Sequence, residues 1–220
     1  DSGNFGPPRR RSCIAKCRHV YASLARDFLV CMGRSLCALF IITCTKAHHQ
    51  KPSRVWNFGF WRPDRLVASL GFFEWSTVVS KPIRILINGF GRIGRTVMRQ
   101  ILTNPENADI EVVAINDIAP IETCAYLFKY DSVFGPYAGM VSNTADSLEI
   151  EGRCFPFFAH SDLRSIDLNG VDVVLECTGN ATTRSVAQAG LDAGASNVLI
   201  SGPSEAADTT VVLGANESEI

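Results

Sequence analysis

The sequence predicts an α/β fold for residues 81–220, a doubly wound parallel sheet that carries a small antiparallel hairpin insertion. Short apolar runs rich in branched residues alternate there with segments of helical periodicity, which is typical of βαβ units. A glycine-rich turn separates the first such run from the first helical segment. The charge balance also changes near residue 80: residues 1–80 hold 12 Lys or Arg against 4 Asp or Glu, whereas residues 81–220 hold 9 against 18.

Strands of the parallel sheet are expected where buried apolar runs end at turn residues. They are IRILIN (83–88), EVVAIN (111–116), VDVVLECT (171–178), NVLIS (197–201) and TVVLGAN (210–216). Helices are expected at residues 93–102, 121–129 and 182–193. Since crossovers between parallel strands are right-handed, these helices should cover both faces of the sheet.

A different pattern lies between the second helix and the third of these strands. The segments GMVSN (139–143), SLEIEG (147–152) and RCFPFFA (153–159) are short, apolar at intervals and separated by turn residues. They predict antiparallel strands joined by tight turns, and together they form the expected hairpin insertion.

Residues 1–80 are unassigned, and we expect a basic leader rich in Cys and Trp that lies outside this fold. Their one long apolar run, residues 28–44, contains Arg34 and lies at the lower length limit for crossing a bilayer. We favour mis-translated or disordered sequence, because the chain begins with Asp1 and the segment lacks helical periodicity. A targeting or membrane segment and an additional domain are the alternatives.

Three glycines, Gly89, Gly91 and Gly94, form the pattern G-x-G-x-x-G between the first strand and the first helix. In a Rossmann-type domain the first permits a tight turn, the second lets the backbone approach a pyrophosphate, and the third lets the helix pack on the strand. Asp117 ends the second strand, where a carboxylate can hydrogen-bond a ribose 2′-hydroxyl. Because that carboxylate would repel a 2′-phosphate, the sequence predicts NAD in preference to NADP.

Six motifs then resemble the amino-terminal half of the glyceraldehyde-3-phosphate dehydrogenase family, in the family's order and spacing. They are NGFGRIGR (88–95), AIND (114–117), YDS (130–132), ECTG (176–179), GA-x-NVLISGPS (194–204) and VVLGAN (211–216). The resemblance covers residues 83–216 and implies the NAD-binding domain of that family.

The resemblance also implies roles for particular residues. The backbone amides of Arg92 and Ile93 would bind the pyrophosphate of NAD, and Asp117 would hold the adenosine ribose. Thr178 and Gly179 would line the cleft at the end of the third parallel strand. Ser201 would lie near the nicotinamide ribose. No metal site is expected.

Three positions depart from the family's pattern. Phe134 stands where a histidine usually follows YDS-x, Ala181 where an aromatic residue is common, and Ser161 where a basic residue is usual. These departures bear on the affinity for the cofactor more than on the resemblance to the family.

No catalytic residue is assigned, because the family's nucleophile lies in a segment S-x-C-T-T-N that the 220 residues do not contain. Cys177 lies in the cleft strand, but no histidine lies near it in sequence, so we expect a buried structural thiol. Cys124 and Cys154 are also expected to be packing residues.

The implied parent is a phosphorylating, NAD-dependent glyceraldehyde-3-phosphate dehydrogenase of glycolysis and gluconeogenesis, which oxidises a sugar phosphate aldehyde to 1,3-bisphosphoglycerate. It is expected to be a cytoplasmic homotetramer with neither nucleic acid nor membrane as partner, and the fragment is expected to bind NAD without turnover. Two alternatives stay open: a sister dehydrogenase acting on erythrose 4-phosphate, and a non-catalytic NAD-binding module.

Overall fold

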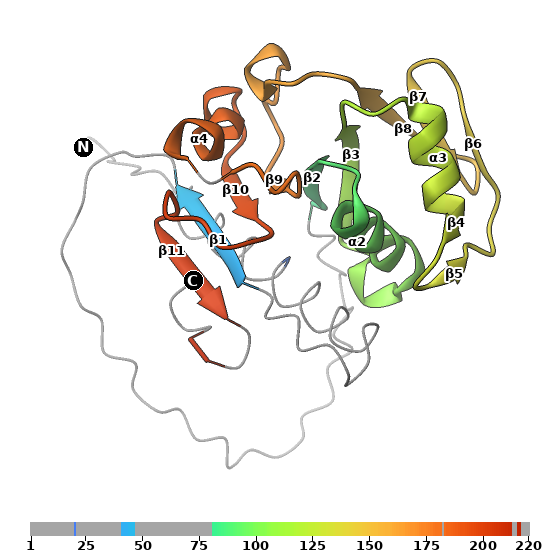
Figure 1. The fold of residues 1–220 in the computed structure, drawn as a ribbon, viewed down its shortest axis with the longest axis horizontal. Coiled ribbons are helices and arrows are strands. Elements are labelled where there is room, and N and C mark those ends of the chain that lie inside the picture. Colours follow the sequence, from blue (N-terminus) through green and yellow to red (C-terminus); the bar gives the residue numbers. More distant parts are fainter. Residues whose placement is uncertain (1–19, 21–40, 47–80, 182, 213–214, 217–220) are drawn as a thin grey trace, which may run out of the picture.

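The computed structural model describes residues 20, 41–46, 81–181, 183–212 and 215–216. Five of its strands run parallel: β8 (Arg153–Phe158), β3 (Ile110–Asn116), β2 (Ile83–Asn88), β9 (Val173–Glu176) and β10 (Asn197–Ile200), neighbours in that order. The predicted, mainly parallel sheet is therefore confirmed, with β2 at the centre of these five strands (Figure 1). Its membership differs from the prediction: the segment RCFPFFA, expected only in the antiparallel hairpin, supplies β8, and the strand expected at residues 210–216 is not one of the five.

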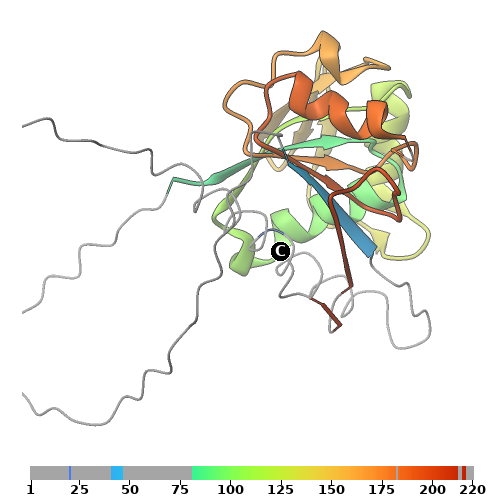
Figure 2. The same ribbon diagram turned by 90° about the vertical axis from the view of Figure 1, so that its left-hand side faces the viewer.

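Helices cover both faces of this sheet, as the sequence predicts. They are α2 (Arg92–Thr103), α3 (Ile121–Lys129) and α4 (Arg184–Asp192), with short 3₁₀ turns η1 (Pro105–Asn107) and η2 (Leu163–Ser165). Figure 2 shows α2 and α4 on opposite sides of the strands. Because successive strand residues point to opposite faces, Ile85 and Ile87 join the core under α2 and α3, whereas Leu86 joins the core under α4.

The predicted hairpin insertion is present and continues the main sheet. Strands β6 (Val141–Asn143) and β7 (Ser147–Ile150) are antiparallel to their neighbours, and β7 pairs with β8, which in turn pairs in parallel with β3. A separate two-stranded sheet joins β4 (Tyr130–Asp131) to β5 (Gly135–Pro136). Because β8 runs parallel to β3, the residues that follow it lie at the same edge of the sheet as those that follow β3.

A strand that the sequence analysis did not predict lies at the other side of the sheet. Strand β1 (Ile41–Lys46) pairs antiparallel with both β10 and β11 (Thr209–Val212), so β11 does not pair with β10 directly. Its sequence, IITCTK, is rich in branched residues that favour strands, and without it β10 would present unpaired backbone groups on that side.

The apolar run at residues 28–44 is described only from residue 41, where it enters β1, and residues 28–40 lie outside the described residues. In the part of the chain that the structure describes, no helix has the length and apolar character needed to cross a membrane. The proposed division of the chain at residue 80 stays a prediction.

Candidate functional site

A cleft of about 390 Å³ opens at the carboxyl ends of the parallel strands. Four of the predicted cofactor-binding residues line it: Gly89, Gly91, Asp117 and Thr178. They come from the ends of three adjacent strands, β2, β3 and β9, which fold topology brings to one edge. In open α/β sheets this edge is the usual place for a ligand.

The three glycines of the turn have different structural reasons. Gly89 has φ +91°, and a Cβ there would lie 2.6 Å from the backbone nitrogen of Thr178. A Cβ at Gly94 would lie 2.2 Å from the carbonyl oxygen of Gly89. At Gly91, which is exposed to the cleft, a Cβ would meet no atom within 4 Å. Gly89 and Gly94 are therefore required by packing, whereas Gly91 leaves space open at the start of α2.

The start of α2 is suited to an anion. Gly91 is the N-cap residue of α2, and no described side chain caps this end of the helix. The first amides of a helix have no acceptor within the helix, and the helix dipole adds partial positive charge there. The backbone amides of Arg92 and Ile93 belong to this first turn, so they can donate to a phosphate group that reaches the space beside Gly91.

The carboxylate of Asp117 is held in a defined orientation. Its Oδ2 accepts a hydrogen bond from the amide of Phe90, within the glycine turn, and its Oδ1 accepts one from the amide of Ala119. Each carboxylate oxygen has a second acceptor site, so Asp117 can still accept hydrogen bonds from hydroxyl groups in the cleft. These residues fit a dinucleotide: a place for a pyrophosphate on α2 and an acceptor for a ribose next to it.

The remaining predicted residues lie beside the cleft and do not line it. The side chain of Ile93 packs against the core under α2, and Arg92 is exposed. Gly179 has φ +78° in the turn after β9. Ser201 directly follows β10, and its side chain is hydrogen-bonded to Cys177.

Several cleft residues were missed by the sequence analysis. Ile118 and Val186 supply exposed apolar surface, and His160, Asn180, Asn88 and Asn116 supply polar groups. The parallel alignment of β8 with β3 would have revealed His160 and Ser161, since it places the end of β8 at this edge. Ser161, where the family usually has a basic residue, does lie in the cleft.

Ala181, in contrast, is buried in the core under α4 and is not part of the cleft lining. The oxygen of its carbonyl accepts a hydrogen bond from the Ser204 hydroxyl at 2.6 Å.

The cysteines of the domain do not form a reactive site. Cys177 is half-buried and lines the cleft, so the expectation of a buried thiol is met only in part. Desolvation raises the pKa of its thiol to about 12, an effect that its hydrogen bond to Ser201 only partly offsets. Burial likewise raises the pKa of Cys124, on α3, to about 11. The expectation that Cys154 packs in the core is wrong: it lies on β8 with its side chain exposed, because that position of the strand faces solvent.

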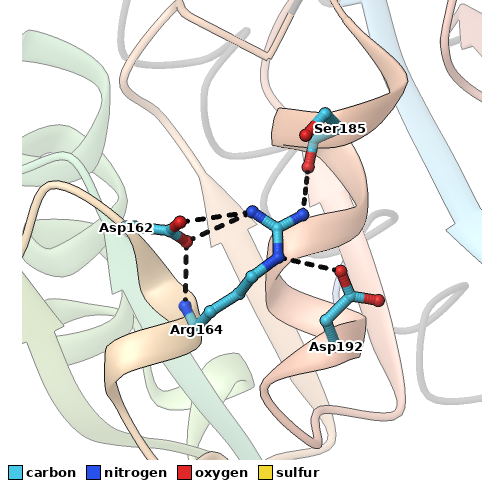
Figure 3. Close-up of polar contacts among 4 residues, drawn as sticks. All are labelled: Asp162, Arg164, Ser185 and Asp192. Carbon is cyan, nitrogen blue, oxygen red and sulfur yellow. Dashed lines mark hydrogen bonds and ion pairs between the residues drawn. The ribbon is translucent and has the colours of Figure 1, made fainter.

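A polar cluster around Arg164, on η2, joins two segments that each contribute a residue to the cleft lining (Figure 3). Its guanidinium donates to Asp192 at 3.0 Å and to the carbonyl oxygen of Ser185 at 2.7 Å, both on α4. It also pairs with Asp162 at 3.3 Å, and its backbone amide donates to the same carboxylate at 3.0 Å. The cluster joins the segment after Ser161 to the helix that carries Val186.

Comparison with known proteins agrees with the geometry. The model of the family described as glyceraldehyde 3-phosphate dehydrogenase, NAD binding domain, matches residues 83–184. The glyceraldehyde-3-phosphate dehydrogenase of Xanthobacter flavus is 45% identical over 141 residues, which are 63% of this chain and 42% of the relative. That of Thermotoga maritima is 46% identical over 140 residues, 62% of this chain and 41% of the relative.

A third relative, the glyceraldehyde-3-phosphate dehydrogenase of Pseudomonas aeruginosa, is 46% identical over 136 residues, 61% of this chain and 41% of the relative. The chain thus spans less than half the length of the curated relatives it matches. The family match covers the glycine turn, Asp117 and Thr178, which are the residues that build the cleft. Residues 83–184 therefore match the NAD-binding domain of the glyceraldehyde-3-phosphate dehydrogenase family.

Proposed function

We propose that the cleft at the carboxyl ends of β2, β3 and β9 binds NAD, and that the whole protein is a phosphorylating glyceraldehyde-3-phosphate dehydrogenase. One observation carries the proposal that the cleft binds NAD. The open space at Gly91, the uncapped start of α2 and the oriented carboxylate of Asp117 converge on a single cleft. A pyrophosphate and a ribose are the two groups that such a set of donors and acceptors binds.

In this proposal each part of the cleft has a separate task. The amides of Arg92 and Ile93 hold the pyrophosphate, and Asp117 accepts hydrogen bonds from the adenosine ribose. The exposed apolar surface of Ile118 and Val186 offers a wall for the adenine ring. Thr178, Gly179 and Ser201, at the ends of β9 and β10, lie toward the nicotinamide side.

The cofactor, when bound, supplies a hydride acceptor. The residues of this domain bind and orient it, and none of them is assigned as a nucleophile. Cys177 is not suited to that task, because the raised pKa of its thiol leaves very little thiolate near neutral pH. Oxidation of the sugar phosphate aldehyde is therefore assigned to the whole protein, which we propose to be a cytoplasmic homotetramer acting in glycolysis.

Calorimetric titration of the full 220-residue chain with NAD and, separately, with NADP tests the cofactor proposal. We expect saturable binding of NAD and weaker binding of NADP, because the Asp117 carboxylate repels a 2′-phosphate. A chain that is folded by circular dichroism and binds neither cofactor at millimolar concentration would contradict the proposal.

A further inference from the structure

Three polar side chains lie next to one another on the last rung of the parallel sheet. Asn88, at the end of β2, is paired in register with Asn116 of β3 on one side and with Glu176 of β9 on the other. All three are buried, with exposed fractions of 8%, 3% and 2%. Buried polar groups need hydrogen-bond partners, and these side chains find them in each other and in the adjoining loops.

The backbone of His160, just after β8, sets the orientation of the first amide. Its N–H donates to Oδ1 of Asn116 at 3.0 Å, and its carbonyl oxygen accepts from Nδ2 of Asn116 at 2.9 Å. The other N–H of the same Nδ2 donates to Oδ1 of Asn88 at 2.7 Å. Nδ2 of Asn88 must then point the other way, and it donates to Oε2 of Glu176.

Glu176 closes this chain of hydrogen bonds as an acceptor at both oxygens. While Oε2 receives Asn88, Oε1 receives the amide of Thr178 at 2.9 Å and also the Thr178 hydroxyl. Among the described residues no Lys or Arg forms an ion pair with Glu176. Its charge is therefore held by hydrogen bonds alone, and only an acceptor at both oxygens satisfies all the donors.

We propose that Glu176 is a positioning residue. Through this chain of hydrogen bonds it fixes the positions of the strand ends that line the cleft. Asn88 and Asn116 themselves line the cleft, and Glu176 lies directly before Cys177, which lines it too. The chain thus holds the ends of four strands in one arrangement. The expected effect on affinity for NAD rests on the proposed NAD binding, but the hydrogen bonds themselves are present without cofactor.

Each hydrogen bond in this series has a fixed donor and a fixed acceptor, which makes a sharp test possible. Glu176→Gln places an NH₂ group opposite Nδ2 of Asn88 or, with the amide turned over, opposite the backbone N–H of Thr178. Turning Asn88 over moves the same conflict to Asn116, which the His160 backbone holds fixed. Asn88→Asp alone brings two carboxylates together. In the double variant, the new carboxylate at position 88 accepts from both Gln at 176 and Asn116, so every donor again meets an acceptor.

The experiment compares the full chain with Glu176→Gln, Asn88→Asp and the double variant by calorimetric titration with NAD. Each single variant should bind NAD at least about tenfold more weakly, because a buried donor or acceptor is left unsatisfied, and the double variant should return to within about threefold of wild type. Glu122→Gln, on the exposed side of α3, is the control for loss of one charge. Wild-type affinity in both single variants, or a folded double variant as weak as they are, would overturn the proposal.

A second readout separates this proposal from the cofactor assignment. Hydrogen exchange of the Thr178 amide, followed by NMR without NAD, should be at least about tenfold faster in each single variant and slow again in the double variant. If the wild-type chain does not bind NAD, the cofactor proposal fails. The exchange rates alone then decide whether Glu176 is a positioning residue. Equal rates in all four proteins would overturn it. Single variants that do not fold support it if the double variant folds, and contradict it if the double variant does not.

Discussion

The Asp117 carboxylate accepts a hydrogen bond from the backbone amide of Phe90 at 2.5 Å. This contact joins the end of β3 to the middle of the glycine turn, 27 residues earlier in the chain. It links the two elements of the dinucleotide pattern directly, so the residue that would hold the ribose also holds the turn that would admit the pyrophosphate.

Asp117→Asn keeps the size of the side chain, removes its charge and replaces one of the two oxygens that accept from the amides of Phe90 and Ala119. We expect weaker NAD binding but no loss of NADP binding, because the repulsion of a 2′-phosphate disappears. The dissociation constant for NADP divided by that for NAD should then fall by about tenfold. Competition calorimetry measures the ratio, and an unchanged ratio would show that the charge at position 117 does not select the cofactor.

Gly91→Asp should have opposite effects on stability and on binding. Aspartate is a good N-cap residue and interacts favourably with the start of a helix, so the free energy of unfolding should rise by about 0.3 kcal/mol. The new carboxylate would occupy the open space beside the pyrophosphate site, and NAD affinity should fall at least about tenfold. Denaturant unfolding and calorimetry give the two values.

Gly94→Ala is the matched comparison in the same turn. Its Cβ would meet the backbone oxygen of Gly89 at 2.2 Å, so something in the turn must move. We expect a loss of about 2 kcal/mol in the free energy of unfolding. If Gly94→Ala were as stable as wild type, or if Gly91→Asp bound NAD normally, the different roles assigned to these two glycines would be wrong.

The regular part of the fold could be predicted from sequence to within a few residues. Strand β2 and helix α3 have the expected bounds, since each is a clear periodic segment bounded by turn residues. Strand β1 could not be predicted, because its partners β10 and β11 lie more than 150 residues away and no local pattern reports such a pairing. The hairpin was predicted, but its continuity with the main sheet depends on the long-range pairing of β8 with β3.

The residues of the candidate site also divide into those that the local sequence predicts and those that depend on long-range packing. Gly89, Gly91 and Asp117 were predicted because their spacing follows from the local chemistry of a strand, a turn and a helix. His160 and Val186 could not be found this way, since they reach the cleft only through the packing of β8 and α4. The link from Asn116 to Glu176 was missed because it depends on the register of three parallel strands.

The thiol of Cys177 should be unreactive near neutral pH. With its pKa raised from 9.0 to about 12, the thiolate fraction at pH 8 is about a thousandfold below that of an ordinary thiol. Brief treatment with iodoacetamide, read peptide by peptide by mass spectrometry, should modify the exposed Cys154 before Cys177. Modification of Cys177 as fast as that of Cys154 would contradict the assignment of Cys177 as a structural thiol.

The cluster around Arg164 predicts a pH effect. The backbone amide of Arg164 and, to a smaller extent, its guanidinium lower the pKa of Asp162 from 3.8. A lowered pKa stabilises the fold at higher pH, and that contribution is lost as the pH falls through the folded-state value. Arg164→Met keeps the amide, so the pKa of Asp162 should rise only part of the way toward 3.8.

Carbon-detected NMR titration of the Asp162 carboxyl group measures this change. Arg153→Met, on the exposed face of β8, removes a similar charge away from the cluster and should leave the pKa of Asp162 as it is. An equal pKa in wild type and Arg164→Met would show that the guanidinium does not act on Asp162.

Calorimetric comparison of wild type and Asp117→Ala in NAD binding tests the account most directly. The variant removes the only carboxylate among the described residues that line the cleft. We expect saturable binding by the wild-type chain and at least about a tenfold loss of affinity in a variant that remains folded. Equal affinities, or no binding by the folded wild-type chain, would contradict a dinucleotide site built from the glycine turn and Asp117.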